Sequence, residues 1–107
     1  MGDAYLEREP ARSEIDQLPG ATLLEFGSPY CGHCQRAQAV ITQALAAEVG
    51  LRHIKIFDGP GLALGRSFVI KLWPSLILVV DGTEIARVVR PQDAAAIEQL
   101  LSRRADG

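Results

Sequence analysis

Two cysteines, Cys31 and Cys34, stand three positions apart and are the only cysteines of the chain. Residues three apart on a helical turn share one face, with Cβ atoms roughly 5–6 Å apart. That spacing suits a disulfide, so the pair can open and close with little movement of the backbone. The chemistry that this pattern indicates is reversible thiol–disulfide exchange, in which a thiolate is the nucleophile.

The residues around the pair favour a reactive first cysteine. Residues 32–49 have helical apolar spacing, so Cys31 lies at the N-terminus of a predicted helix. Free N–H groups and the helix dipole stabilise a thiolate there. His33 can add a positive charge or a hydrogen bond, and Gly32 permits a tight turn that leaves Cys31 open to a partner. We therefore predict that Cys31 is the exposed nucleophile and Cys34 its buried partner.

Other chemistry is less well supported. A structural disulfide over so short a loop would stabilise the fold little, because the entropic gain grows with loop length. A zinc or soft-metal site would need His33 and His53 beside both sulfurs, and no second Cys-x-x-Cys or His-x₃₋₅-His completes the set. Covalent haem attachment requires a histidine where this chain has Gln35. The glycine-spaced residues 59–65 miss the dinucleotide-binding fingerprint by one position.

The composition is that of a globular protein. The chain has 107 residues, 48% of them apolar and 22% charged, with a formal net charge of -2. This length predicts a single domain over residues 1–107. The weak acidic balance argues against nucleic acid or an anionic membrane as a partner, and the longest apolar run, residues 76–80, is too short to span a bilayer. No secretory signal is visible, so we expect a cytoplasmic location.

The elements that must position the pair alternate along the chain. An apolar run at residues 21–26 predicts a buried strand directly before the cysteine loop, and residues 51–57 predict the next strand. Asp81-Gly82 between two apolar stretches is a strong hairpin signal. The other expected elements are an edge strand at 5–9, a helix at 10–18, a short helix at 62–69, hairpin strands at 75–80 and 83–89, and a last helix starting at Pro91.

Strands that alternate with helices pair in parallel, whereas a hairpin adds antiparallel strands. The sequence therefore predicts an α/β fold, with a mixed central sheet flanked by helices on both faces.

Over residues 21 to about 102 the sequence resembles the thioredoxin superfamily. The resemblance rests on a buried strand followed by Cys31-Gly32-His33-Cys34, an acid six positions before the first cysteine, a lysine on the next strand, and an X-Pro step before an apolar hairpin. The CGHC sequence resembles protein disulfide isomerase domains more than typical thioredoxins, which carry CGPC. The resemblance implies the thioredoxin fold and a redox-active disulfide. The further matching residues are Glu25, Lys55, Trp73 and Pro74.

The resemblance also implies roles for these distant residues. The family places an acid at Glu25 beneath the second cysteine, as a proton acceptor and donor through water, with Lys55 as its nearby cation. On a strand covered on both faces, burying a carboxylate costs free energy unless the group is neutral or paired. The residues alone also allow both Glu25 and Lys55 to be exposed strand residues. The family makes the bond between Trp73 and Pro74 cis, and the backbone there would pair with an extended client segment.

The chain departs from the family pattern at several positions, and Tyr30, Trp73 and Arg90 imply a client or reductase surface unlike that of a general thioredoxin. Tyr30 replaces the Trp that usually precedes the first cysteine, and Gly27 replaces another common Trp. Arg90 stands where the family often has Gly on the client-facing rim. The residues expected to face a client are Tyr30, Gly32, Trp73, Pro74 and Arg90.

The expected function is that of a monomeric thiol–disulfide oxidoreductase. Cys31 attacks a disulfide of a client protein, and Cys34 resolves the mixed disulfide while Glu25 handles its proton. Neither a cofactor nor a metal is expected, and electrons come from a thioredoxin reductase-like protein or another thiol donor. Two alternatives stay open. His33 favours oxidase- or isomerase-type exchange if it stabilises the thiolate, and the same fold also serves as a non-enzymatic redox-responsive binding module.

Overall fold

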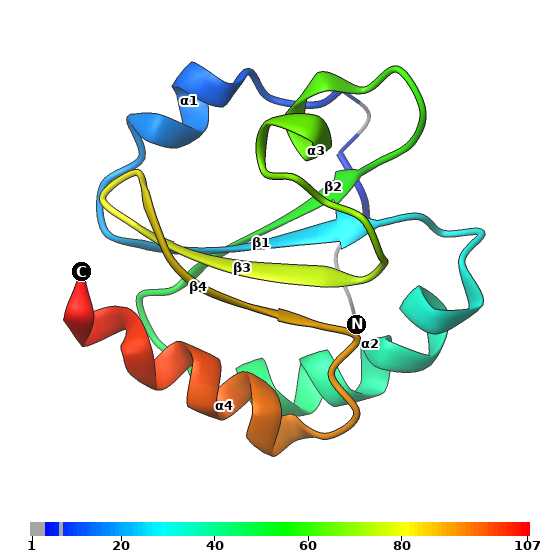
Figure 1. The fold of residues 1–107 in the computed structure, drawn as a ribbon. Coiled ribbons are helices and arrows are strands. Elements are labelled where there is room, and N and C mark those ends of the chain that lie inside the picture. Colours follow the sequence, from blue (N-terminus) through cyan, green and yellow to red (C-terminus); the bar gives the residue numbers. More distant parts are fainter. Residues whose placement is uncertain (1–3, 7) are drawn as a thin grey trace.

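The computed structural model describes residues 4–6 and 8–107. It contains a four-stranded sheet whose strands are β1 (Ala21–Gly27), β2 (Arg52–Phe57), β3 (Ser75–Val80) and β4 (Thr83–Val89). They are ordered β2-β1-β3-β4. β1 pairs in parallel with β2 and antiparallel with β3, which pairs antiparallel with β4 (Figure 1). The predicted mixed sheet, parallel first and then antiparallel at the hairpin, is confirmed.

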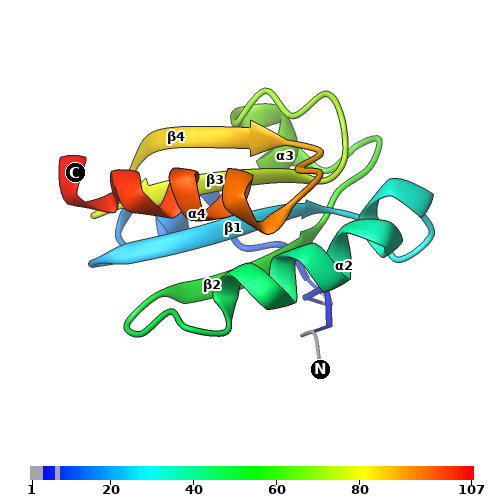
Figure 2. The same cartoon turned by 90° about the horizontal axis from the view of Figure 1, so that it is seen from below.

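Helices cover both faces of this sheet, as the sequence predicted. α2 (Gly32–Leu45) and α4 (Ala94–Ser102) pack on one face, and α1 (Arg12–Asp16) and α3 (Ala63–Ser67) lie on the other (Figures 1 and 2). A short 3-10 turn, η1 (Arg103–Asp106), follows α4. Among the residues that the structure describes, no helix is both long and apolar enough to cross a membrane.

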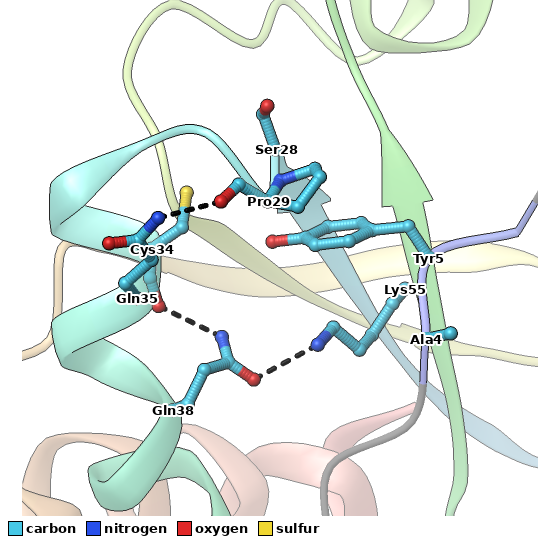
Figure 3. A pocket seen from close by; sticks show the side chains of 8 residues that line it. All are labelled: Ala4, Tyr5, Ser28, Pro29, Cys34, Gln35, Gln38 and Lys55. Carbon is cyan, nitrogen blue, oxygen red and sulfur yellow. Dashed lines mark hydrogen bonds between the residues drawn. The ribbon is translucent and has the colours of Figure 1, made fainter.

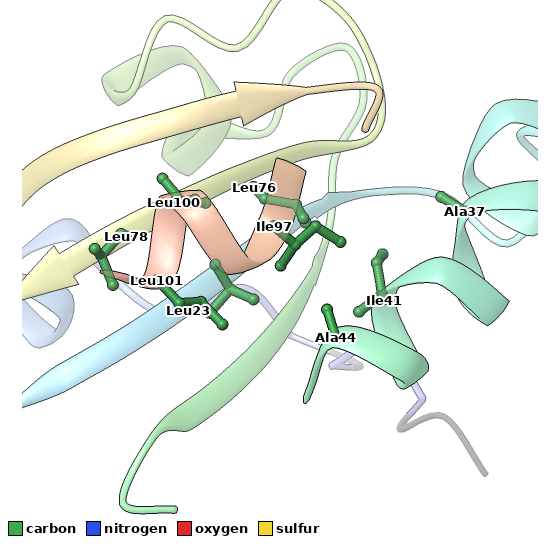
Figure 4. Close-up of a cluster of buried hydrophobic side chains, with 9 residues drawn as sticks. All are labelled: Leu23, Ala37, Ile41, Ala44, Leu76, Leu78, Ile97, Leu100 and Leu101. Carbon is green, nitrogen blue, oxygen red and sulfur yellow. The ribbon is translucent and has the colours of Figure 1, made fainter. Parts of the chain in front are cut away.

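Two hydrophobic clusters hold these layers together, because successive side chains of a strand point to opposite faces of the sheet. One cluster joins the sheet to α2 and α4, and Figure 4 shows its members: Leu23, Ala37, Ile41, Ala44, Leu76, Leu78, Ile97, Leu100 and Leu101. The other joins the sheet to α1 and α3 through Ile15, Leu24, Phe26, Ile56, Leu64, Phe68, Ile77 and Val79. Residues 22–27 of the central strand β1 are therefore all buried, Glu25 included.

Several element ends differ from the prediction. α2 ends at Leu45, short of the predicted end at 49, because Val49 is 85% exposed and has no apolar surface to pack on. α4 begins at Ala94 and not at Pro91, because the Asp93 side chain accepts a hydrogen bond from the Ala96 N–H and so caps the helix.

The two predicted N-terminal elements are also shorter than expected, and α1 occupies only the middle of the predicted helix at 10–18. Of the edge strand predicted at 5–9, the structure has a single parallel bridge between Leu6 and Ile56, and residue 7 lies outside the described residues. That bridge nevertheless fixes the N-terminal segment against β2.

Candidate active site

The two cysteines lie where the chain leaves β1 and enters α2. Cys31 is the N-cap of α2, and its sulfur accepts a hydrogen bond from the backbone N–H of Cys34, with 3.2 Å between sulfur and nitrogen. Both are free thiols. Cys31 is partly exposed, whereas Cys34 is 1% exposed. The helix start thus gives Cys31 the accessible sulfur and turns Cys34 into the protein.

The two thiols have opposite pKa shifts. Burial raises the pKa of the Cys34 thiol to about 11, and its hydrogen bond to Cys31 acts in the same direction. Burial also acts to raise the pKa of Cys31. It is outweighed by hydrogen bonds from the Cys34 side chain and from the N–H groups of Cys34 and His33, together with the charge of Arg90, so the Cys31 pKa is lowered. Cys31 therefore loses its proton first.

His33 supports Cys31 through its backbone more than through its ring. The charge of Arg90, partial desolvation and the charge of Arg36 lower the pKa of the His33 ring, so it is mostly neutral at pH 7. Its Nδ1 lies 3.3 Å from the Arg36 Nη2, which donates to it. The hydrogen bond from His33 that helps to lower the Cys31 pKa comes from its backbone N–H. The positive charge near Cys31 comes from Arg90.

Glu25 is fully buried within a hydrogen-bonded network on the α2 side of the sheet. One carboxylate oxygen lies 2.9 Å from the His53 Nε2, and the other accepts a hydrogen bond of 2.9 Å from the Gln38 side chain. The same Gln38 nitrogen donates to the backbone carbonyl of Cys34 at 2.9 Å. Lys55 is the cross-strand neighbour of Glu25, but its ammonium donates to the Gln38 Oε1 at 3.0 Å. Gln38 therefore connects Glu25, Lys55 and the second cysteine.

A cleft of about 480 Å³ opens beside Cys34 (Figure 3). Its wall includes Ser28, Pro29 and Gln38, and the ring of Tyr5 lies across it, 4.5 Å from the Lys55 ammonium. The figure shows the Tyr5 hydroxyl pointing from the N-terminal segment towards α2. Through this cleft, solvent can reach the surroundings of the otherwise buried second cysteine.

The Trp73–Pro74 peptide bond is cis, as the sequence predicted. Arg90 holds this segment twice, because its Nε donates to the Trp73 carbonyl at 2.7 Å and its backbone N–H donates to the Pro74 carbonyl at 2.9 Å. Arg90 has a φ of 51°, in the left-handed region that favours glycine. The glycine that the family often carries here would therefore adopt the same backbone easily.

A second contact fixes the side chain of Trp73. Its indole N–H donates to the Asp58 carboxylate at 2.9 Å. Asp58 is 8% exposed and lies against Gly65 of α3, where a Cβ atom would overlap the carboxylate. The glycine at position 65 therefore makes room for the acid that orients Trp73.

The sequence reasoning missed four residues of this site. Gln38 had a usable signal, because it lies one turn after Cys34 and so shares its helix face. His53 was considered only as a metal ligand, and it is instead the partner of Glu25. Tyr5 and Asp58 come from irregular segments, and no periodicity marks them. Of the predicted residues, Tyr30 is 87% exposed, so it is available to a partner.

Within residues 4–6 and 8–107, no three His, Cys, Asp or Glu side chains are grouped so that they could hold a metal ion.

The fold is α/β with a mixed sheet, one helix starts on a Cys-x-x-Cys pair, and a cis-proline segment is present. Together these features define a class of thiol–disulfide oxidoreductase. The thioredoxin family model matches residues 4–103. The chain therefore belongs to the thioredoxin family. These matches confirm the predicted fold and the predicted oxidoreductase class.

Individual relatives agree with this assignment. The structure of thioredoxin 2 from Pseudomonas aeruginosa PAO1 in its reduced form is similar with 45% identity and a TM-score of 0.87, and the match covers 100% of both chains. The thioredoxin of Chlamydia pneumoniae is 34% identical over 89 residues, which are 80% of this chain and 84% of that protein. Protein disulfide-isomerase A2 of Pongo abelii is 34% identical over 90 residues, 78% of this chain. The chain spans only 17% of the length of that relative.

Proposed function

We propose that this protein reduces disulfides of client proteins, with Cys31 as the attacking thiolate and Cys34 as the resolving thiol. The observation that carries the proposal is the contrast between the two sulfurs. Cys31 is accessible and its pKa is lowered, whereas Cys34 is buried and its pKa is raised to about 11. An accessible thiolate is the species that attacks a disulfide.

The exchange runs in two steps. The Cys31 thiolate attacks one sulfur of the client disulfide, a Cys31–client disulfide forms, and the other client sulfur leaves as a thiolate that solvent protonates. Cys34 then loses its proton and attacks the Cys31 sulfur, which releases the first client sulfur. The client gains two electrons and two protons, and the Cys31–Cys34 pair is oxidised to a disulfide.

Glu25 takes the proton of Cys34 in the second step. Two contacts support this role: Gln38 donates both to Glu25 and to the Cys34 carbonyl, and Lys55 reaches the network through the same Gln38. The adjoining cleft admits water, which can carry a proton between the thiol and the carboxylate. Lys55 holds the network in place and keeps a positive charge near the carboxylate.

The client segment lies beside Cys31. Tyr30 and Gly32 border the attacking sulfur, and the client backbone pairs with the Trp73–Pro74 segment in the manner of strand addition. Arg90 holds the Trp73–Pro74 segment through the carbonyl groups of both residues.

Another thiol system must re-reduce the pair, because each turnover leaves it oxidised. We assign this step to a thioredoxin reductase-like protein or another thiol donor. The protein acts as a cytoplasmic monomer, as one unit over residues 1–107, and neither an organic cofactor nor a metal takes part.

Trapping of mixed disulfides tests the assignment of the two sulfurs. Cys34→Ser should accumulate a covalent complex with client protein, because attack proceeds but resolution does not. Cys31→Ser should accumulate none, because the remaining thiol is buried and mostly protonated near neutral pH. Non-reducing gels after incubation with a disulfide-bonded client provide the readout. Equal trapping by the two variants would be incompatible with the assignment.

Oxidase- or isomerase-type exchange is a second candidate, because the lowered pKa of Cys31 stabilises the reduced, ionised pair. Equilibration against glutathione decides the direction: a potential near −270 mV, on the order of that of a reducing thioredoxin, supports a reductant, and one near −180 mV supports an isomerase. Turnover of a small artificial disulfide separates both from a redox-responsive binding module, which would show none.

A further inference from the structure

A second hollow, of about 450 Å³, lies beside Cys31 between the start of α2 and the segment after β4. We call it the cationic groove, and the polar residues that line it are His33, Arg36, Arg90 and Gln92. No acidic side chain lines it within the described part of the chain. The chain as a whole has a net charge of -2, so this groove has the opposite sign to the molecule around it.

The two guanidinium groups of the groove lie near the turn that carries Cys31. The Arg36 Nη1 would be 3.2 Å from a Cβ atom at Gly32, so this guanidinium lies over the turn between the cysteines. Arg90 is held by its Nε on the Trp73 carbonyl. Its charge also reaches Cys31, since it is one of the groups that outweigh burial and lower the pKa of that thiol.

These two arginines differ from four others of the chain in having no ion-pair partner among the described residues. Among the described residues, neither Arg36 nor Arg90 forms an ion pair with a carboxylate of the chain. The arginines that do form one are Arg12, Arg87, Arg103 and Arg104. A guanidinium matches a carboxylate through two parallel hydrogen bonds. The groove is therefore electrostatically complementary to a carboxylate brought by a partner.

We propose that the cationic groove selects client segments that carry Asp or Glu beside the disulfide to be reduced. The inference rests on the proposed function and specifies its substrate class. A carboxylate next to the client cysteine pairs with Arg36 and Arg90 while the client sulfur meets Cys31. Complementary charge of this kind raises the rate of productive encounter and falls in effect as salt rises.

Three peptides test this selectivity. They share one disulfide and differ only in whether Glu, Gln or Lys flanks it. At low salt, the Glu peptide should be reduced about tenfold faster than the Lys peptide, with Gln between them. The ratio should shrink at high salt, and Arg36→Glu should bring it to one or invert it. Arg103→Glu makes the same charge change on η1, and it is the matched control.

The outcomes separate the two claims. Equal rates for the three peptides, or an equal change of the ratio in Arg36→Glu and Arg103→Glu, would overturn the selectivity while leaving the proposed function intact. Failure to reduce any of the peptides would overturn the proposed function, and this inference with it.

A different observation concerns Tyr5. Its hydroxyl is buried and has no hydrogen-bond partner among the described residues. The segment that carries it is fixed, because the Leu6 N–H donates to the Lys55 carbonyl at 3.0 Å and the Lys55 ammonium lies over the Tyr5 ring. Leaving a buried hydroxyl unpaired is unfavourable, so a partner at another stage of the reaction is to be expected.

Gly27 shows which group that partner is. A Cβ atom at this position would be 2.6 Å from the Cys34 sulfur and 3.0 Å from the Tyr5 hydroxyl oxygen. The thiol and the hydroxyl thus both lie over the backbone of Gly27, where a larger residue would displace both. Burial and the negative charges of Cys34 and Glu25 raise the pKa of Tyr5, so its hydroxyl keeps its proton and remains a donor.

We infer that Tyr5 donates a hydrogen bond to the Cys34 sulfur while that sulfur is a thiolate. The bond stabilises the nucleophile of the resolving step and, in the reverse reaction, the leaving group. Tyr5 itself transfers no proton.

Tyr5→Phe tests this role by removing only the hydroxyl. Single-turnover resolution of a mixed disulfide should slow about tenfold near neutral pH, and its pH midpoint should move upward. Ser102→Ala, which removes a hydroxyl at the far end of α4, is the control and should change neither. An unchanged pH profile in Tyr5→Phe would overturn the inference, and a loss of stability alone in denaturant melts would make Tyr5 a packing residue.

Discussion

The two sulfurs are one helical turn apart, yet the regions beside them differ in almost every physical respect. Beside Cys34 there is a buried network with one carboxylate, Glu25, and an aromatic hydroxyl. Beside Cys31 there is an open groove with two guanidinium groups and no carboxylate among its described lining residues. The first region disfavours a charged sulfur and the second favours one, so position on the helix sets the pKa of each thiol.

This contrast shows how two identical side chains acquire different tasks. The chemistry of a thiol is the same at both positions, so the difference comes from hydration, hydrogen bonds and nearby charge. Each region can then be changed separately, and each change should affect one sulfur more than the other.

The largest effect is expected for Glu25→Gln, which acts on the Cys34 side. Resolution of a mixed disulfide should slow about 100-fold near neutral pH, because a proton acceptor is lost. The deficit should shrink as pH approaches about 11, the raised pKa of Cys34, where the thiol loses its proton unaided. The variant should be at least as stable as the original, because it no longer buries a charge.

Single-turnover rates against pH, with denaturant melts alongside, check this expectation. A variant that is less stable but equally fast would show that Glu25 has a structural role only.

The next effect concerns Gly27→Ala, which crowds the same region sterically. The added Cβ would lie 2.6 Å from the Cys34 sulfur, so the free energy of unfolding should fall by about 1–3 kcal/mol. Gly59→Ala is the matched control, because its Cβ would make only an ordinary contact at 3.9 Å with Leu62. Denaturant melts of both variants measure the difference. The packing argument fails if the two changes are equally tolerated.

The smallest effect is expected on the Cys31 side, from two substitutions of His33. His33→Pro removes the backbone N–H that helps to lower the pKa of Cys31, so that pKa should rise by about half a unit and the pair should become more reducing. His33→Ala keeps the N–H and removes only the ring, so it should change the Cys31 pKa much less. Thiolate absorbance against pH compares them. If the Cys31 pKa rose more in His33→Ala than in His33→Pro, the ring and not the backbone N–H would be the group that lowers that pKa.

Much of the fold and of the candidate site could be predicted from the sequence, because these features depend on local sequence patterns. The cysteine spacing, the apolar strand that contains Glu25 and the Trp73-Pro74 step all have signals within a few residues. These signals also identify the family, and the family predicts the sheet order that brings them together. The fold and the central residues of the site follow from that.

The site contacts that the sequence did not predict depend mostly on segments that are distant along the chain. Glu25 pairs with His53 because two parallel strands lie in a particular register, and Tyr5 lines the same cleft as Cys34 because one bridge fixes the N-terminal segment. Neither register nor bridge has a periodic signal. The ring of His33 was expected to add a positive charge or a hydrogen bond. Arg90, which the fold brings near it, and Arg36, three residues along α2, favour its neutral form.

The contact between Asp58 and Trp73 has a consequence for inherited variation. Gly65 admits the Asp58 carboxylate only because it has no side chain, and that carboxylate orients the indole on the segment that we propose faces the client. Almost any substitution at this one codon would therefore release Trp73 while leaving both sulfurs and their proton network untouched. A lineage could thus alter which clients it recognises, through a helix remote from the cysteines, and keep its redox chemistry intact.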